Sequence, residues 1–222
     1  MKRIILIYLL ALIGTSTAFA WGREGHEGEI KPPDALATWT DLIFRKDIGE
    51  KWHVGGFVEY CTVDRHDGKG MVNDEIILRP IVGYNPLDWL RFQLQMDFLY
   101  SYTGGMYLRY LPDVTLHWKA GDFRFAFRNR LQLSHKLSTG QLSPVMRTRL
   151  KVDYLVPDSP VSIHAAAEPY WLNSVTKARY LAGVDVQVHK NVCLTADYIR
   201  YANYSITSPH SNVISFALYV RI

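Results

Sequence analysis

The chain has 222 residues, of which 48% are hydrophobic and 21% charged, and its formal net charge is +4. This length favours one domain, and so small a charge excess gives no support to nucleic-acid binding. After residue 20 no apolar run is as long as a membrane-spanning helix, so the sequence does not predict an inner-membrane protein.

The first twenty residues have the features of an export signal. Lys2 and Arg3 precede an apolar run over residues 4–13, and Ala18-Phe19-Ala20 fits an A-x-A cleavage site. The apolar run is too short for a spanning helix, which needs roughly 20 apolar residues. We therefore predict a cleaved signal peptide over residues 1–20. The polar, glycine- and proline-containing stretch 21–36 is predicted to be irregular.

From residue 37 to residue 222 the chain alternates apolar and polar residues. In the last run, Ile214, Phe216, Leu218 and Val220 alternate with smaller or polar residues. A period of two is typical of β-strands, because successive side chains point to opposite faces. The predicted strands are 37–47, 51–63, 72–84, 88–102, 106–119, 122–135, 145–156, 160–172, 177–189, 191–204 and 212–222.

Two kinds of connection alternate between these runs. Tight turns such as 85–88 and 120–122 alternate with stretches that are mostly longer or more polar, such as 64–71, 137–144 and 205–211. Outer-membrane barrels have short periplasmic turns and longer external loops. The sequence therefore predicts an all-β fold, an antiparallel transmembrane β-barrel in an outer membrane.

The number of strands is the open point of this prediction. Eleven runs are counted, whereas single-chain bacterial barrels normally have an even number of strands. Either the segment 28–34 helps to form a twelfth strand, or one of the runs is divided wrongly. We expect about twelve strands, and ten is the alternative.

A soluble, lipocalin-like barrel would also alternate, with its apolar face turned inward. The predicted strands are long enough to cross a bilayer, they are too numerous for a small soluble barrel, and aromatic residues such as Trp52, Trp89 and Trp118 lie near their ends. We therefore expect the apolar face to meet lipid and the opposite face to line the lumen.

The predicted lumen is charged. An arginine facing lipid at mid-depth costs about 2–4 kcal/mol, so the charged face of each strand must point inward. The neighbouring runs 122–135 and 145–156 then form one basic wall, whereas the charges that face inward over the whole lumen are nearly balanced. The predicted lumen cluster comprises Arg124, Arg128, Arg130, Arg147, Arg149, Lys151, Asp153, Glu168, Arg179, Asp185, Asp97 and Asp113.

Two interpretations of this lumen stay open. The charges could pair with one another and fill a closed structural barrel. Alternatively, the barrel could be a narrow porin-like channel whose basic wall favours anions or acidic solutes. The sequence alone does not choose between them.

No catalytic or metal-binding pattern stands out. Ser134 and His135 are adjacent in a strand, so they face opposite sides and cannot pair. His117 shares its face with Asp113, which is the best basis for the alternative of a lipid- or envelope-modifying enzyme, but no serine stands out nearby. We predict no enzymatic activity, no cofactor and no metal, with Cys61 and Cys193 as free thiols. The expected partners are membrane lipid, the barrel-assembly machinery during insertion and small solutes.

Several segments of the chain resemble a known family. The sequences at 125–132, 147–150, 168–170 and 179–184, with Arg-x-Arg pairs on consecutive strands and a Glu on the next, are similar to the exported barrels of domain of unknown function 2490. The resemblance covers nearly the whole mature chain and implies an outer-membrane barrel of a Gram-negative bacterium, with no established activity, substrate or cofactor. It implies that the inward charged cluster contains Arg128, Arg130, Arg147, Arg149, Glu168 and Arg179.

One residue departs from general barrel practice. The chain ends at Ile222, where barrels usually end with an aromatic residue that the assembly machinery recognises.

Overall fold

The computed structural model describes residues 34–64, 68–172, 174–204 and 210–222, and these residues form strands and turns only. Within those ranges no helix is long and apolar enough to cross a membrane. The predicted signal peptide, and the stretch 21–36 up to residue 33, lie outside the described residues. The twelve strands are β1 (Ala35–Ile48), β2 (Trp52–Asp64), β3 (Val72–Leu87), β4 (Leu90–Ser101), β5 (Gly105–Tyr110), β6 (Asp113–Ala120), β7 (Phe123–Lys136), β8 (Gln141–Leu155), β9 (Val161–Trp171), β10 (Val175–His189), β11 (Val192–Asn203) and β12 (Ser211–Arg221).

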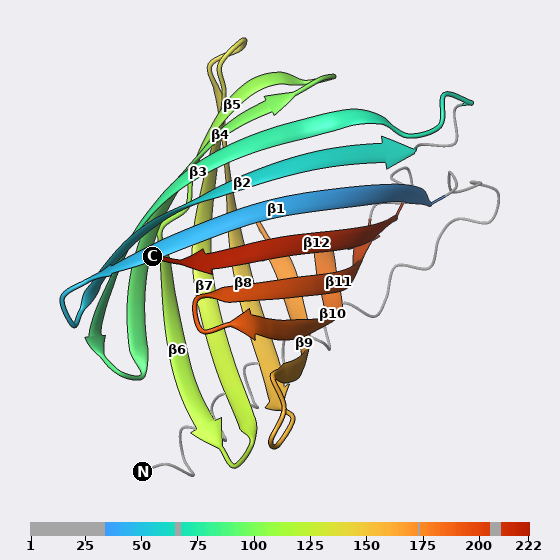
Figure 1. The fold of residues 1–222 in the computed structure, drawn as a ribbon. Coiled ribbons are helices and arrows are strands. Elements are labelled where there is room, and N and C mark those ends of the chain that lie inside the picture. The colour runs from blue at the N-terminus through green and yellow to red at the C-terminus, as the bar shows by residue number, and fades with distance from the viewer. Residues whose placement is uncertain (1–33, 65–67, 173, 205–209) are drawn as a thin grey trace.

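The strands form one closed sheet, a barrel (Figure 1). Every other pairing is antiparallel, but β1 and β12 close the barrel as a parallel pair, from Ala35 opposite Ser211 to Arg45 opposite Arg221. The prediction of an all-β barrel is therefore confirmed. β1 begins two residues before the predicted residue 37, because Ala35 and Leu36 already pair with β12.

The run predicted as a single strand over 106–119 is two strands. β5 and β6 are separated by Leu111 and Pro112, and proline has no N–H to donate to a neighbouring strand. The register with β4 is unchanged across the break, since Met96 is opposite Tyr110 and Gln93 is opposite Asp113. Twelve strands therefore occupy eleven positions around the barrel.

Of the two possibilities that the sequence left open, the structure therefore supports a wrongly divided run, because the break at 111–112 yields the twelfth described strand. Residues 28–33 lie outside the described residues, and Asp34 belongs to no strand. An odd number of positions makes the first and last strands run in the same direction, which is why β1 and β12 pair in parallel.

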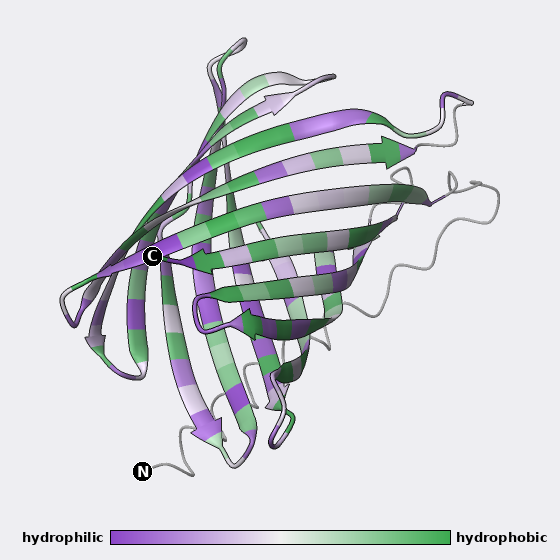
Figure 2. Ribbon diagram, viewed as in Figure 1, coloured by the Kyte–Doolittle hydropathy of each residue, from purple (hydrophilic) through white to green (hydrophobic). Residues whose placement is uncertain are grey.

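The two faces of the barrel differ in polarity, and Figure 2 shows hydrophobic and hydrophilic residues alternating along the strands. Large apolar side chains on the outer face are open to the surroundings: Leu78, Leu94 and Phe216 are 51%, 59% and 56% exposed. Inward-facing charged residues are covered, with Arg130 3% and Glu168 1% exposed. The orientation is thus the predicted one, with the apolar side chains outside and the charged side chains inside.

The connections differ between the two ends of the barrel. At one end the strands join through two to five residues, for example 88–89 between β3 and β4 and 121–122 between β6 and β7. At the other end two connections, 65–71 and 204–210, are seven residues long.

The long external loop predicted over 137–144 is wrong. Only residues 137–140 connect β7 to β8, and Pro144 lies within β8. Proline is tolerated there because β9 pairs with β8 only from Met146 onward, so Pro144 has a free edge on that side.

One glycine makes room for a buried ring. His53 on β2 is 2% exposed and lies opposite Gly83 on β3. A Cβ atom added at Gly83 would lie 2.0 Å from Cε1 of the His53 imidazole, closer than real Cβ contacts. Gly83 is therefore required by the packing of His53.

We expect Gly83→Ala to lower the free energy of unfolding by about 1–3 kcal/mol, because the added methyl overpacks the site. The measurement is the urea midpoint of the refolded barrel in detergent. His53→Ala in the same chain should relieve the clash, so the double variant should lose less than the two single changes added together. Strict additivity would mean that the two side chains do not meet.

Candidate functional site

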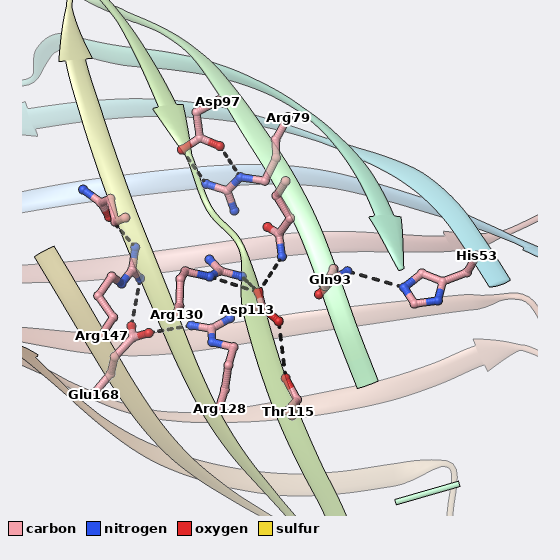
Figure 3. Close-up of polar contacts among 12 residues, drawn as sticks. His53, Arg79, Gln93, Asp97, Asp113, Thr115, Arg128, Arg130, Arg147 and Glu168 are labelled. Atoms are coloured by element: carbon pink, nitrogen blue, oxygen red, sulfur yellow. Dashed lines mark hydrogen bonds and ion pairs between the residues drawn. The ribbon is translucent and has the colours of Figure 1, made fainter. Parts of the chain in front are cut away.

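The best-connected charge in the lumen is the carboxylate of Glu168 on β9 (Figure 3). Its Oε1 lies 2.5 Å from Nη2 of Arg128, and its Oε2 lies 2.9 Å from Nη2 of Arg147 and 2.5 Å from Nη2 of Arg179. These arginines come from β7, β8 and β10. One buried carboxylate therefore links four consecutive strands.

Two more buried carboxylates, those of Asp113 and Asp97, each bind an arginine of a neighbouring strand. Asp113 on β6 accepts from Arg130 on β7, with the Nη2 donor 2.6 Å away, and from Gln95 at 3.0 Å. Asp97 on β4 accepts two hydrogen bonds from Arg79 on β3 (Figure 3). Since Asp97, Asp113 and Glu168 are at most 4% exposed, their charges are compensated within the barrel wall.

A separate charged group surrounds His164 on β9. Its Nδ1 lies 3.1 Å from Asp185 and its Nε2 2.7 Å from Asp197. Lys151 lies 3.0 Å from Asp153 and 4.0 Å from Asp185. Ligand atoms of Asp153, His164 and Asp185 lie within 4.8 Å of one another, as in a metal site. However, His164 and Lys151 already occupy these carboxylates, so the arrangement is better described as an ion-pair cluster.

A cavity of about 700 Å³ runs along the lumen. Its lining extends from Ala37 and Ser211, near the end with the longer connections, to Arg45 and Tyr219, near the end with the short turns. Five acidic side chains line it among the described residues, whereas ten lining side chains are basic. The basic residues are Arg45, Arg79, Arg91, Arg109, Arg128, Arg130, Arg147, Arg149, Lys177 and Arg179.

The sign of this surface follows from where the carboxylates lie. Asp97, Asp113 and Glu168 do not line the cavity but are buried behind the arginines that they bind. The sequence indicated that the inward-facing charges are nearly balanced. At the surface of the cavity, where a solute would meet them, the basic side chains are therefore in excess.

The predicted lumen residues fall into groups. Arg128, Arg147 and Arg179 meet at Glu168, and Arg130 pairs with Asp113. Lys151, Asp153 and Asp185 belong to the His164 cluster, and Arg124 reaches Asp153 only at 4.0 Å. Asp97 pairs with Arg79, and among the described residues Arg149 has no partner in this network.

Sequence reasoning missed Arg45, Arg109 and Lys177, which also line the cavity. The signal for Arg109 was available, because it lies an even number of residues from Asp113 and therefore shares its face. The inward direction of His164 could have been found in the same way, because it lies four residues from Glu168, but its two carboxylate partners could not, since they lie on other strands.

The suggested enzyme pair is not formed. Asp113 is bound to Arg130, Gln95 and Thr115, and in the described part of the chain no hydrogen bond joins it to His117. A base without its orienting carboxylate gives no support to catalysis through these two residues.

Comparison with known proteins gives a family and a fold. The family described as "Protein of unknown function (DUF2490)" matches residues 36–212. No curated protein matches the chain. One solved structure that aligns with it is the NanC porin in a rhombohedral crystal form, with 14% identity over 77% of this chain and 92% of the porin and a TM-score of 0.45. A likeness at this level says nothing about what the present barrel carries.

We expect Glu168→Ala to lower the free energy of unfolding by about 3–5 kcal/mol, because it leaves three buried arginines without their shared counter-charge. The measurement is the denaturant midpoint of the refolded barrel in detergent. Glu75→Ala is the control, since Glu75 is 29% exposed and lies 4.0 Å from Arg109, and it should cost less than about 1 kcal/mol. Equal midpoints for the two variants would contradict the role given to Glu168.

Proposed function

Because the chain belongs to the DUF2490 family, whose function is unknown, its own lumen is the best guide, and we propose that it is an outer-membrane channel for small anionic solutes. The observation that carries this proposal is the cavity of about 700 Å³ that extends along the barrel and is lined by twice as many basic as acidic side chains.

The outer face supports a membrane location. Apolar side chains such as Leu94 and Phe216 are more than half exposed, and others like them occur on strands all around the barrel. Soluble monomers rarely expose so continuous an apolar surface, whereas outer-membrane barrels carry an apolar band of this kind. Short turns at one end and longer connections at the other fit periplasmic and external ends, respectively. The expected signal peptide is consistent with export.

The cavity lining supports passage of anions. A narrow path whose wall carries an excess of positive charge concentrates anions and repels cations. The carboxylates that could reverse this sign, Asp97, Asp113 and Glu168, are held behind their arginine partners. The walls of the cavity therefore favour an anion at each level where an arginine is exposed to it.

The alternative from the sequence is a closed structural barrel. The ion pairs of Glu168 and Asp113 support it, because they fill part of the interior near β7 and β8. These pairs lie against the wall, however, and the cavity extends past them between the two ends of the barrel. This geometry favours the channel.

The membrane location is tested by fractionation of cells that express the full chain. We expect the processed protein in the outer-membrane fraction, resistant to extraction by alkaline carbonate, because its apolar belt needs lipid. A protein that is released with the soluble periplasmic contents would contradict the location.

The channel is tested in planar bilayers with refolded protein under a KCl gradient. We expect discrete conductance steps and a reversal potential that shows preference for chloride over potassium. Lys177→Gln removes a positive charge from the cavity wall and should lower this preference. Lys46→Gln, at an exposed position, is the control for total charge. A silent bilayer would support the closed barrel, and a cation preference would exclude the proposed solute class.

A further inference from the structure

Two arginines in the lumen differ from the rest. Arg91 on β4 and Arg149 on β8 both line the cavity, yet among the described residues neither forms an ion pair or a side-chain hydrogen bond. The Nε atoms of both are buried without a partner. Each therefore has a guanidinium group free to bind something in the lumen.

The two arginines lie at one level of the barrel. Arg91 is opposite Thr115 on β6, Thr115 is opposite Arg128 on β7, and Arg128 is opposite Arg149. Neighbouring strands are about 4.8 Å apart, so the Cα atoms of Arg91 and Arg149 are separated by about 14 Å along the curved wall. Between them, Arg128 is held by Glu168 (Figure 3). The two free guanidinium groups thus flank a paired one.

The surroundings of this level are basic. The charges of Arg45, Arg91 and Arg149 all act on the ring of His117, and those of Arg45 and Arg91 act on His53. The carboxylates whose charges act on the two arginines are already bound to other arginines: Asp113, which acts on Arg91, pairs with Arg130, and Glu168, which acts on Arg149, pairs with Arg128, Arg147 and Arg179. Arg45 is itself paired with Asp47.

Unpaired cations in a narrow lumen are costly unless an opposite charge compensates them. We propose that Arg91 and Arg149 form a binding site for an oxyanion, a carboxylate or a phosphate, which a solute occupies as it passes along the lumen. The guanidinium fork matches the paired oxygens of both groups. The inference rests on the proposed channel, because the anion reaches the site through the lumen.

The role of such a site is selection during passage. A channel with a binding site conducts best when the solute binds well enough to enter and weakly enough to leave. Two free arginines on either side of a paired one provide charge and oxygen-specific donors without closing the path. Solutes that carry a carboxylate or a phosphate are thereby favoured over halide ions, which offer the two parallel N–H donors only a single acceptor atom.

The site is tested by titrating inorganic phosphate, and separately acetate, into the refolded full-length barrel in chloride-free buffer by calorimetry. We expect Arg91→Gln with Arg149→Gln to weaken binding of the preferred anion about tenfold or more, since charge-assisted hydrogen bonds are lost. The control is Lys46→Gln with Lys119→Gln, which removes two charges at exposed positions outside the cavity lining among the described residues. Comparison of the two anions distinguishes a phosphate site from a carboxylate site.

Equal affinities of the arginine and control variants would overturn the site, as would binding of neither anion by the unchanged protein. Arg91→Lys with Arg149→Lys keeps the charge but loses the fork, so it should bind with intermediate affinity and guards against a folding defect of the glutamine variant. Calorimetry does not require an open path. If the barrel does not conduct but binds an anion, and the glutamine variant loses this binding, the result supports the site and contradicts the channel. If the barrel conducts but its anion binding does not depend on the two arginines, the result supports the channel and contradicts the site.

Discussion

The ion pairs of Glu168 are the interaction on which the interior of this barrel depends. In the register of β7 and β8, Arg128 lies opposite Arg149 and Arg130 opposite Arg147. Like charges placed directly opposite one another destabilise a sheet. Glu168 offsets this repulsion by binding arginines of β7, β8 and β10 at once, and it does so at a position that is 1% exposed. The basic wall can therefore exist because one carboxylate is placed behind it.

The same arrangement gives the lumen its sign. Asp113 and Asp97 bind Arg130 and Arg79 in the manner of Glu168, and all three carboxylates are withdrawn from the cavity. Their arginine partners remain at its surface. The charges inside the barrel are nearly balanced in number, but the surface of the cavity is basic. The acidic side chains compensate the arginines from within the wall, while the basic side chains face the solute. The proposed selection of anions follows from this segregation and not from the net charge of the chain.

Closure of the barrel depends on a different constraint. Pro112 interrupts the strand between β4 and β7, but the register continues from β5 into β6 without a shift. The wall therefore has eleven positions, and its first and last strands meet in parallel. An even count is not needed for closure, since each edge strand finds a partner whichever way it runs.

The sequence by itself determined the fold class and which face of each strand is charged. Alternation such as that of Ile214, Phe216 and Leu218 sets the side-chain faces, and the energy of placing an arginine against an apolar medium decides which face turns inward. The positions of most connections between strands were also predicted correctly from their turn residues. The loop over 137–144 was wrong because the proline at 144 is harmless on a free edge, and whether an edge is free depends on the extent of another strand.

Only the tertiary structure decided which charges meet. Glu168 could be assigned to the lumen from its face, but its three arginine partners depend on the register of four strands and on the reach of long side chains. The isolation of Arg91 and Arg149 has the same origin, because a side chain lacks a partner when no unbound carboxylate lies within its reach. Local periodicity carries the direction of a side chain; its partner is set by contacts between strands that are far apart in the sequence.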